Sequence, residues 1–151
     1  MQAPLAAAPR IRDRFLADHR GLEASIESLV QRLAANDRSE TSRRWREFER
    51  RLLGHLDAEE AALIPALFDA SERDARILVQ EHRHLRARLL ELGAGLESRG
   101  LPVGGLRNFV DELRAHAQTE DRLLYLWADA HVDEARLPQA LSALTGETTA
   151  K

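Results

Sequence analysis

The sequence predicts an all-α protein, folded as an antiparallel up-down four-helix bundle with at most one short additional helix near the C-terminus. Three observations lead to this prediction. Four segments of roughly 25 residues carry apolar side chains at three- and four-residue spacing, which is typical of amphipathic helices. Aromatic residues make up only 5% of the 151 residues, against 44% hydrophobic and 31% charged residues, so the composition favours helices over sheets. The second half of the chain also repeats the residue pattern of the first half.

The chain has the length of one compact domain, and no second domain is expected. We expect residues 1–9 to form a flexible N-terminal segment, residues 10–145 to form the bundle, and residues 146–151 to form a flexible tail. The net charge of -3 is small and the charges are interspersed, which argues against nucleic acid or an anionic membrane as a partner. No stretch approaches the ~20 apolar residues of a membrane span, and no secretory signal is evident, so a cytoplasmic location is expected.

The first helix is expected from about residue 10 to about residue 35, where the Asn36-Asp37 pair ends it. Its apolar face is formed by Ile11, Phe15, Leu22, Ile26, Leu29, Val30 and Leu33. Asp37 and Glu40 resemble a capping box, so the second helix is expected to begin here. Pro65 lacks a backbone donor and is expected to bend or end the second helix within about one turn. The apolar face of the second helix carries Trp45, Phe48, Leu52, Leu56, Leu63 and Leu67.

The third helix is expected to begin at Ser71, which together with Asp74 gives the next capping signal. Its apolar face carries Ile77, Leu78, Leu85, Leu89, Leu92 and Leu96. The glycine-rich segment 100–105 is expected to form the loop before the fourth helix. The fourth helix carries Leu106, Phe109, Val110, Leu113, Leu123 and Trp127. The short additional helix would run from about Pro138 to Leu144.

The chemically informative part of the repeat is a His-x-x-x-Glu pair in each half of the chain. The two pairs are His55 with Glu59 and His116 with Glu120. Each pair follows, at nearly the same interval, an acid-His-Arg triplet whose central residue is His19 in the first half and His82 in the second. Residues four positions apart lie on one face of a helix, about 6 Å apart along its axis, so each His/Glu pair can converge on one point.

These histidines and glutamates fall on the apolar faces of their helices. A single buried histidine is more often a hydrogen-bonded core residue than a ligand. An ionised carboxylate there, however, costs several kcal/mol unless a cation or a hydrogen-bond network compensates it, and Glu59 and Glu120 both lie there. A shared cation therefore explains the set, and without cysteine it must be bound by histidine and carboxylate. His84 points away from the face of His82, and His131 follows the last strong heptad, so neither is expected to be a ligand.

From Asp18 to Asp121 the chain resembles the hemerythrin-like, HHE cation-binding family, whose four-helix bundles hold a non-haem di-iron centre. Its ligand pattern is closest to that of the repair-of-iron-centres proteins. The resemblance implies two iron ions with a bridging oxide or hydroxide. The implied ligands are His19, His55, His82 and His116 as terminal ligands, and Glu59 and Glu120 as bridging carboxylates. Histidine and carboxylate also suit manganese or zinc, so the identification of iron rests on the resemblance.

The chain departs from the oxygen-carrying members of this family at two positions. Arg86 stands where they have a fifth histidine, and their last carboxylate corresponds to Asp121 instead of Glu120. The internal repeat with Glu59 favours Glu120, and Asp121 stays the alternative. Counting ligands for two six-coordinate irons leaves one open position on each. For Arg86 a structural salt bridge is preferred over steering of an anionic ligand, and for Tyr125 plain packing is preferred over a role beside the metal.

The preferred function is that of a di-iron protein that binds or reacts with a small ligand, O2, NO or peroxide, at the open positions. The alternative is an iron or oxygen sensor, or an iron donor for iron-sulfur cluster repair, without catalysis of its own. A bundle without a physiological metal is a third interpretation. The sequence offers no nucleophile setting, phosphate-binding loop or nucleic-acid motif, so no catalytic residue is named. The redox partner and the oligomeric state are left open.

Overall fold

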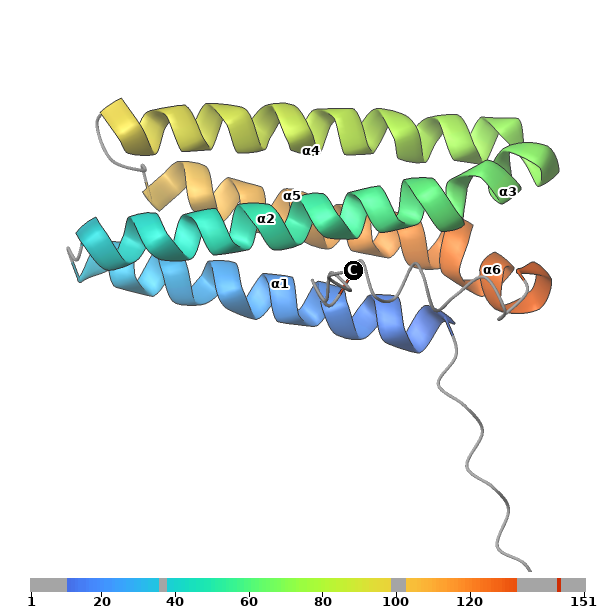
Figure 1. Ribbon diagram of the computed structural model, residues 1–151, viewed down its shortest axis with the longest axis horizontal. Coiled ribbons are helices and arrows are strands. Elements are labelled where there is room, and N and C mark those ends of the chain that lie inside the picture. Colours follow the sequence, from blue (N-terminus) through green and yellow to red (C-terminus); the bar gives the residue numbers. More distant parts are fainter. Residues whose placement is uncertain (1–10, 36–37, 99–102, 133–143, 145–151) are drawn as a thin grey trace, which may run out of the picture.

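Four long helices lie side by side and form the body of the protein (Figure 1). The computed structural model describes residues 11–35, 38–98, 103–132 and 144. The long helices are α1 (Ile11–Ala34), α2 (Arg38–Ala62), α4 (Glu72–Ser98) and α5 (Val103–Glu120). They run alternately up and down, and both α1 and α4 contact α2 on one side and α5 on the other. The expected all-α, antiparallel four-helix bundle is therefore confirmed.

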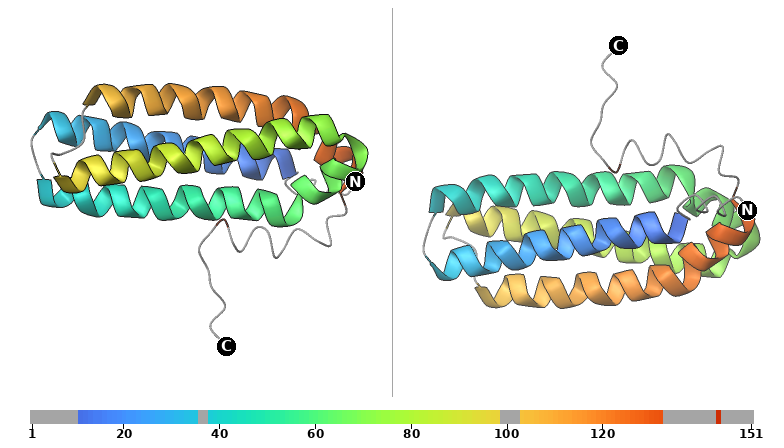
Figure 2. Two further views of the ribbon diagram at one scale, coloured as in Figure 1. Left: turned by 90° about the horizontal axis from the view of Figure 1, so that it is seen from above. Right: turned by 90° about the horizontal axis from the view of Figure 1, so that it is seen from below.

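Three short helical segments gather at one end of the bundle. They are α3 (Ile64–Ala70), the π-helix η1 (Asp121–Tyr125) and α6 (Leu126–His131). Figure 2 shows from two opposite sides that α3 and α6 lie at the same end, where α2 passes into α4. None of the described helices combines the length and the apolar character that crossing a bilayer requires.

Two helix boundaries follow the signals in the sequence. α2 ends at Ala62, and Pro65 lies in the first turn of α3, where a missing backbone donor is tolerated. Ser71 Oγ accepts a hydrogen bond from the backbone amide of Asp74 at 3.4 Å, so the expected capping signal starts α4. Three expectations fall outside the described residues, namely the Asp37 cap, the short helix at 138–144 apart from its last residue, and the flexible segments 1–9 and 146–151.

Two expectations for the last helix are wrong. Segment 100–105 is not entirely a loop, because α5 already begins at Val103. Val103 lies three residues before the buried Leu106 and extends the same apolar face by one turn. The fourth helix is also not one continuous α-helix, because η1 interrupts it directly after Glu120. This interruption changes which residues beyond Glu120 face the core.

The buried apolar residues form two clusters along the bundle. The loop-end cluster, toward the α1–α2 and α4–α5 connections, contains Leu22, Ile26, Leu29, Trp45, Phe48, Leu52, Leu56, Leu85, Leu89, Leu92, Leu106, Phe109, Val110 and Leu113. The α3-end cluster contains Ile11, Phe15, Leu63, Ile64, Leu67, Ala75, Leu78, Leu124, Tyr125 and Ala128. Along each long helix, the candidate metal ligands fall where one cluster passes into the other. The polar side chains therefore form one layer across the middle of the core.

Candidate metal centre

The candidate ligands from all four long helices lie together in this polar layer. They are His19 from α1, His55 and Glu59 from α2, His82 from α4, and His116 and Glu120 from α5. Glu59 and Glu120 are 0% exposed, and none of the four histidines is more than 7% exposed. Because a buried carboxylate costs several kcal/mol unless positive charge compensates it, this burial requires a cation or protons close by. The structure thus brings together the six residues that were preferred as metal ligands.

The ligand atoms form two overlapping groups that share the two glutamates. We call these groups the first and the second metal position, as potential sites: the first contains His19 and His55 with Glu59 and Glu120, and the second contains His82 and His116 with the same two glutamates. Within each group all ligand atoms lie within 4.8 Å of one another. The hairpin of α1 and α2 therefore supplies the histidine pair of the first position, and the hairpin of α4 and α5 supplies that of the second.

Each glutamate spans the two positions. Oε1 of Glu59 lies 2.7 Å from His55 Nε2, and its Oε2 lies 3.1 Å from His82 Nε2. Oε1 of Glu120 lies 3.1 Å from His19 Nε2, and its Oε2 lies 3.6 Å from His82 Nε2. Glu59 thus has one oxygen toward each group, the arrangement that bridging between two ions requires, whereas Oε1 of Glu120 faces both groups, because it also lies 2.5 Å from His116 Nε2.

Carboxylates outside the cluster orient three of the imidazoles. The Nδ1–carboxylate distances are 2.6 Å for His55 with Asp18, 2.8 Å for His116 with Glu81, and 3.0 Å for His82 with Glu60. Because an ionised carboxylate can only accept a hydrogen bond, Nδ1 carries a hydrogen, and in the neutral imidazole that binds a metal Nε2 would present its lone pair to the centre. Asp18 and Glu81 are the acids of the two acid-His-Arg triplets, and each binds the histidine of the following long helix in its hairpin. The repeat in the sequence marked both acids without revealing this role.

Four buried polar atoms of the cluster have no hydrogen-bond partner among the described residues. They are Glu59 Oε2, Glu120 Oε2, His82 Nε2 and His116 Nε2. His116 Nε2 lies only 2.5 Å from Glu120 Oε1, and His82 Nε2 lies 3.1 Å from Glu59 Oε2, yet neither pair is aligned for a hydrogen bond. Buried polar atoms normally have partners, and a cation between these donors would satisfy all four. The residues therefore fit a metal ion.

Without a cation, protons supply the positive charge. Burial lowers the pKa of His55, but the adjoining carboxylates, Glu59 first, outweigh it and raise that pKa to about 10. Burial also lowers the pKa values of His82 and His116, while the two shared glutamates raise them to about 10 and about 9. Burial raises the pKa of Glu120, yet the charge of His116 and the surrounding hydrogen bonds hold it well below its usual value. Metal ions and protons therefore compete for the same nitrogen atoms.

Tyr125 reaches the metal cluster, so the expectation of plain packing is wrong. Its hydroxyl lies 2.8 Å from His19 Nε2 and 3.4 Å from His55 Nε2, and it donates a hydrogen bond to Glu59 Oε1. Burial, followed by the charge of the two shared glutamates, raises the pKa of Tyr125 well above its usual value. The expectation failed because the repeat aligns Tyr125 with the apolar Ile64, and the repeat carries no sign of the π-helix.

The structure separates the two alternative carboxylates of the last helix. Glu120 faces the cluster, whereas Asp121 lies outside it and pairs with Arg12 through two hydrogen bonds of 2.6 and 3.0 Å. His84 and His131 are exposed and do not join the cluster, as expected. Of the two acids, only Glu120 is thus placed to bind a metal at the centre.

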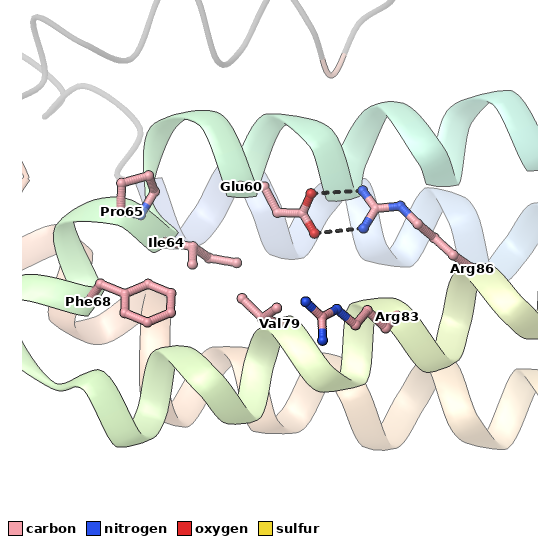
Figure 3. Close-up of a pocket in the computed structure, with 7 residues that line it drawn as sticks. All are labelled: Glu60, Ile64, Pro65, Phe68, Val79, Arg83 and Arg86. Atoms are coloured by element: carbon pink, nitrogen blue, oxygen red, sulfur yellow. Dashed lines mark hydrogen bonds and ion pairs between the residues drawn. The ribbon is translucent and has the colours of Figure 1, made fainter.

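Two surface pockets adjoin the second metal position. One, of about 610 Å³, is lined by apolar residues of α3 and α4 together with Glu60 and Arg86 (Figure 3). Arg86 Nη1 donates to Glu60 Oε1 at 2.7 Å, and the same oxygen lies beside His82 Nδ1. The structural salt bridge expected for Arg86 is therefore confirmed. The other pocket, of about 380 Å³, is lined in part by Glu81 and by His116 itself.

Comparisons with known proteins agree with this centre. The family described as the hemerythrin HHE cation-binding domain matches residues 10–128 of the chain. No curated protein and no solved structure gives a match. The matched range covers the four long helices and both groups of potential ligands, so the family and the buried cluster indicate the same property, the binding of metal cations.

Proposed function

Since the chain belongs to the hemerythrin HHE cation-binding family, we propose that it is a non-haem di-iron protein that binds or reacts with a small ligand, O2, NO or peroxide. One observation carries the proposal, namely that two groups of buried ligand atoms share two glutamates. One group would serve a single ion, whereas two groups with shared carboxylates offer donors for two adjacent ions. Bound iron would supply exchangeable ligand positions and a change of oxidation state.

The residues around the cluster support this role because they orient the candidate ligands and exclude water. Asp18, Glu81 and Glu60 hold three imidazoles with their lone pairs directed inward. The apolar clusters on both sides exclude water and keep the charged donors from being solvated. Iron is proposed over manganese or zinc because of the family, since the donor types suit all three metals.

The metal content of the freshly purified protein is the first test, with two irons per chain expected. Elemental analysis should show that His55→Ala loses iron, because His55 lies in the cluster. The exposed His84 gives the matched control, and His84→Ala should keep two irons. Equal iron content in the two variants would contradict the proposed site.

The reaction with small ligands is tested separately. Iron-loaded, reduced protein is prepared without oxygen, and O2, NO or H2O2 is added while the absorption spectrum is followed. We expect at least one of the three to change the spectrum. If the protein holds two irons and none of the three ligands changes its spectrum, the proposed reactivity is wrong although the metal site stands.

A second function, an iron or oxygen sensor or an iron donor, is favoured by the position of the cluster. The ligands join all four long helices at the layer between the two apolar clusters, so metal loss removes the link at the middle of the bundle. A metal bound only to the folded state stabilises that state by mass action. A sensor or donor is expected to melt at a clearly lower temperature without iron, and equal melting temperatures would count against this function.

A further inference from the structure

Tyr125 brings a phenol into the first metal position. It is the only tyrosine of the chain, and its side chain is 0% exposed. The hydroxyl oxygen contacts His19 Nε2 at 2.8 Å, His55 Nε2 at 3.4 Å and Glu59 Oε1. All three atoms belong to potential ligands of the first position. The ring of Phe15 packs against the tyrosine ring with centroids 5.4 Å apart and helps to keep it in place.

The spacing of these atoms is that of neighbouring ligands around one ion. Bonds from such ions to nitrogen and oxygen are about 2.1 Å long, so ligand atoms at right angles are about 3 Å apart. His19 Nε2 and His55 Nε2 are 3.1 Å apart, and His55 Nε2 lies 2.7 Å from Glu59 Oε1. The Tyr125 oxygen lies at similar distances from two of these ligand atoms, 2.8 Å from His19 Nε2 and 3.4 Å from His55 Nε2. A buried tyrosine needs a polar partner for its hydroxyl, and here the partners are all candidate ligands.

The π-helix η1 explains why this tyrosine faces the centre. In an α-helix each residue is rotated by about 100°, so the fifth residue after Glu120 would point about 140° away from it. In a π-helix residue i is bonded to residue i+5, so the wider turn returns the fifth residue toward the face of the first. Glu120 directly precedes η1 and Tyr125 ends it, and both side chains reach the cluster. Such π-turns within helices are frequent at functional sites.

We propose that Tyr125 is a ligand of the metal at the first position, bound through its phenolate oxygen. The proposal rests on the proposed di-iron function. On binding, the O–H bond breaks and the proton passes to the solvent, and no electron is transferred; a bound cation favours this loss. The first position then has five protein ligands and the second has four. The small ligand therefore binds at the second position, held by His82 and His116.

The surroundings of the two positions agree with this division. His116 itself lines one surface pocket, and Glu60, which holds His82, lines the other. On the side of the first position, Phe15 and Tyr125 belong to the α3-end cluster, so apolar side chains cover it. The residues that line these two pockets include His116 of the second position and none of the candidate ligands of the first position.

Resonance Raman spectra of the ferric, iron-loaded protein test the ligand directly. Because Tyr125 is the only tyrosine, any iron-phenolate vibration must come from it. We expect these vibrations in the wild-type protein and their loss in Tyr125→Phe, which removes only the oxygen. Two irons per chain without phenolate vibrations in the wild type would overturn the inference and leave the di-iron function intact. A chain that binds no iron would overturn both, and the wild-type spectrum decides even if the variant does not fold.

Azide is used to test whether the small ligand binds only at the second metal position. We expect the ferric wild-type protein to bind one azide per iron pair, and Tyr125→Phe to bind two, because the variant frees a ligand position on the first metal. The bound azide is counted by titration with the absorption spectrum as readout. Equal stoichiometry in the two proteins at equal iron content would overturn the assignment of the second position.

Discussion

The two hairpins of the bundle carry the same ligand types but continue differently beyond the glutamate. In the first hairpin α2 ends soon after Glu59, and Pro65 starts α3 with a new direction. In the second hairpin η1 follows Glu120 at once and directs Tyr125 into the cluster. The ligand types that both hairpins have in common thus lie on regular α-helices, where the spacing of two residues in the sequence determines whether they share a helix face. The difference between the two metal positions comes from the irregular turns that follow.

The outer partners of the histidines differ as well. Nδ1 of His55, and of both histidines of the second hairpin, lies beside a carboxylate. Within the described part of the chain, Nδ1 of His19 has no such partner. The acid that corresponds to Glu60 in the repeat is Asp121, and it pairs with Arg12 instead. The first position therefore lacks one outer carboxylate and has the Tyr125 hydroxyl, whereas the second position has both outer carboxylates.

The largest effect is expected from removing a ligand that the two hairpins share. Glu59→Gln keeps the shape of the side chain but removes the negative charge that faces both His55 and His82. We expect the metal content to fall from two ions per chain to less than one, measured by elemental analysis after dialysis. Glu47→Gln, at an exposed glutamate of the same helix, is the matched control and should keep two ions. A Glu59→Gln protein with two ions would show that the hairpins do not depend on a shared carboxylate.

A change of pH acts on both hairpins at once. In the metal-free protein the pKa values of His55 and His82 are raised from 6.5 to about 10, and that of His116 is raised from 6.5 to about 9. Because protons bind these histidines more tightly in the folded state, they add to the free energy of unfolding. This contribution is complete below pH 6.5 and is lost as the pH rises through 9 and 10. Metal binding strengthens over the same interval because fewer protons compete.

We therefore expect the difference in melting temperature between the metal-bound and metal-free protein to widen from pH 7 to pH 10. Thermal unfolding followed by circular dichroism in matched buffers measures it. A difference that narrows over this interval would show that the imidazoles do not carry the protons in the metal-free cluster.

The outer carboxylates allow a direct comparison between the hairpins. Asp18→Asn and Glu81→Gln each remove the charge behind one imidazole, and loss of such a partner typically weakens metal binding about 10–100-fold. We expect the larger effect for Asp18, because its side chain is 15% exposed against 34% for Glu81 and its distance to the imidazole is shorter, 2.6 against 2.8 Å. Competition with a chelator measures both affinities. Equal losses would show that burial of the outer partner does not matter here.

The smallest effect is expected from Arg86, which pairs with Glu60, the outer partner of His82, and with the exposed Asp57. Arg86→Ala removes two solvent-accessible ion pairs, with Glu60 and with Asp57, so the free energy of unfolding should fall by only about 1 kcal/mol. The metal affinity should change by less than tenfold. Urea unfolding and chelator competition measure the two quantities. A loss of metal comparable to that of the Glu81 variant would show that Arg86 does more than hold Glu60.

The fold and the potential ligands could be predicted because they depend on regular helices. Apolar side chains three and four residues apart define the buried faces, and the His-x-x-x-Glu spacing brings His55 and Glu59 to one point on such a face. The preference for Glu120 over Asp121 came from the internal repeat, in which Glu120 corresponds to Glu59. The structure places Asp121 at the surface with Arg12, in agreement with that choice.

The part that could not be predicted lies beyond Glu120. No residue in segment 121–125 signals a π-helix as proline or glycine signals a turn, so plain packing was preferred for Tyr125 over a role beside the metal. The roles of Asp18 and Glu81 could have been inferred from the repeat. An acid next to a ligand points about 100° away from it, toward the neighbouring helix, where the next histidine lies.

The polar layer also determines how the protein opens. The loop-end cluster draws residues from all four long helices, whereas the α3-end cluster takes half of its residues from the short segments α3, η1 and α6. Without a metal, we expect the amide hydrogens of the α3 end to exchange with solvent through local opening, and those of the loop end to exchange only through global unfolding. We expect a bound metal to link both ends into one cooperative unit. The amide exchange rates of α3 and α6, which contribute no ligand, should therefore depend on whether the centre holds a metal.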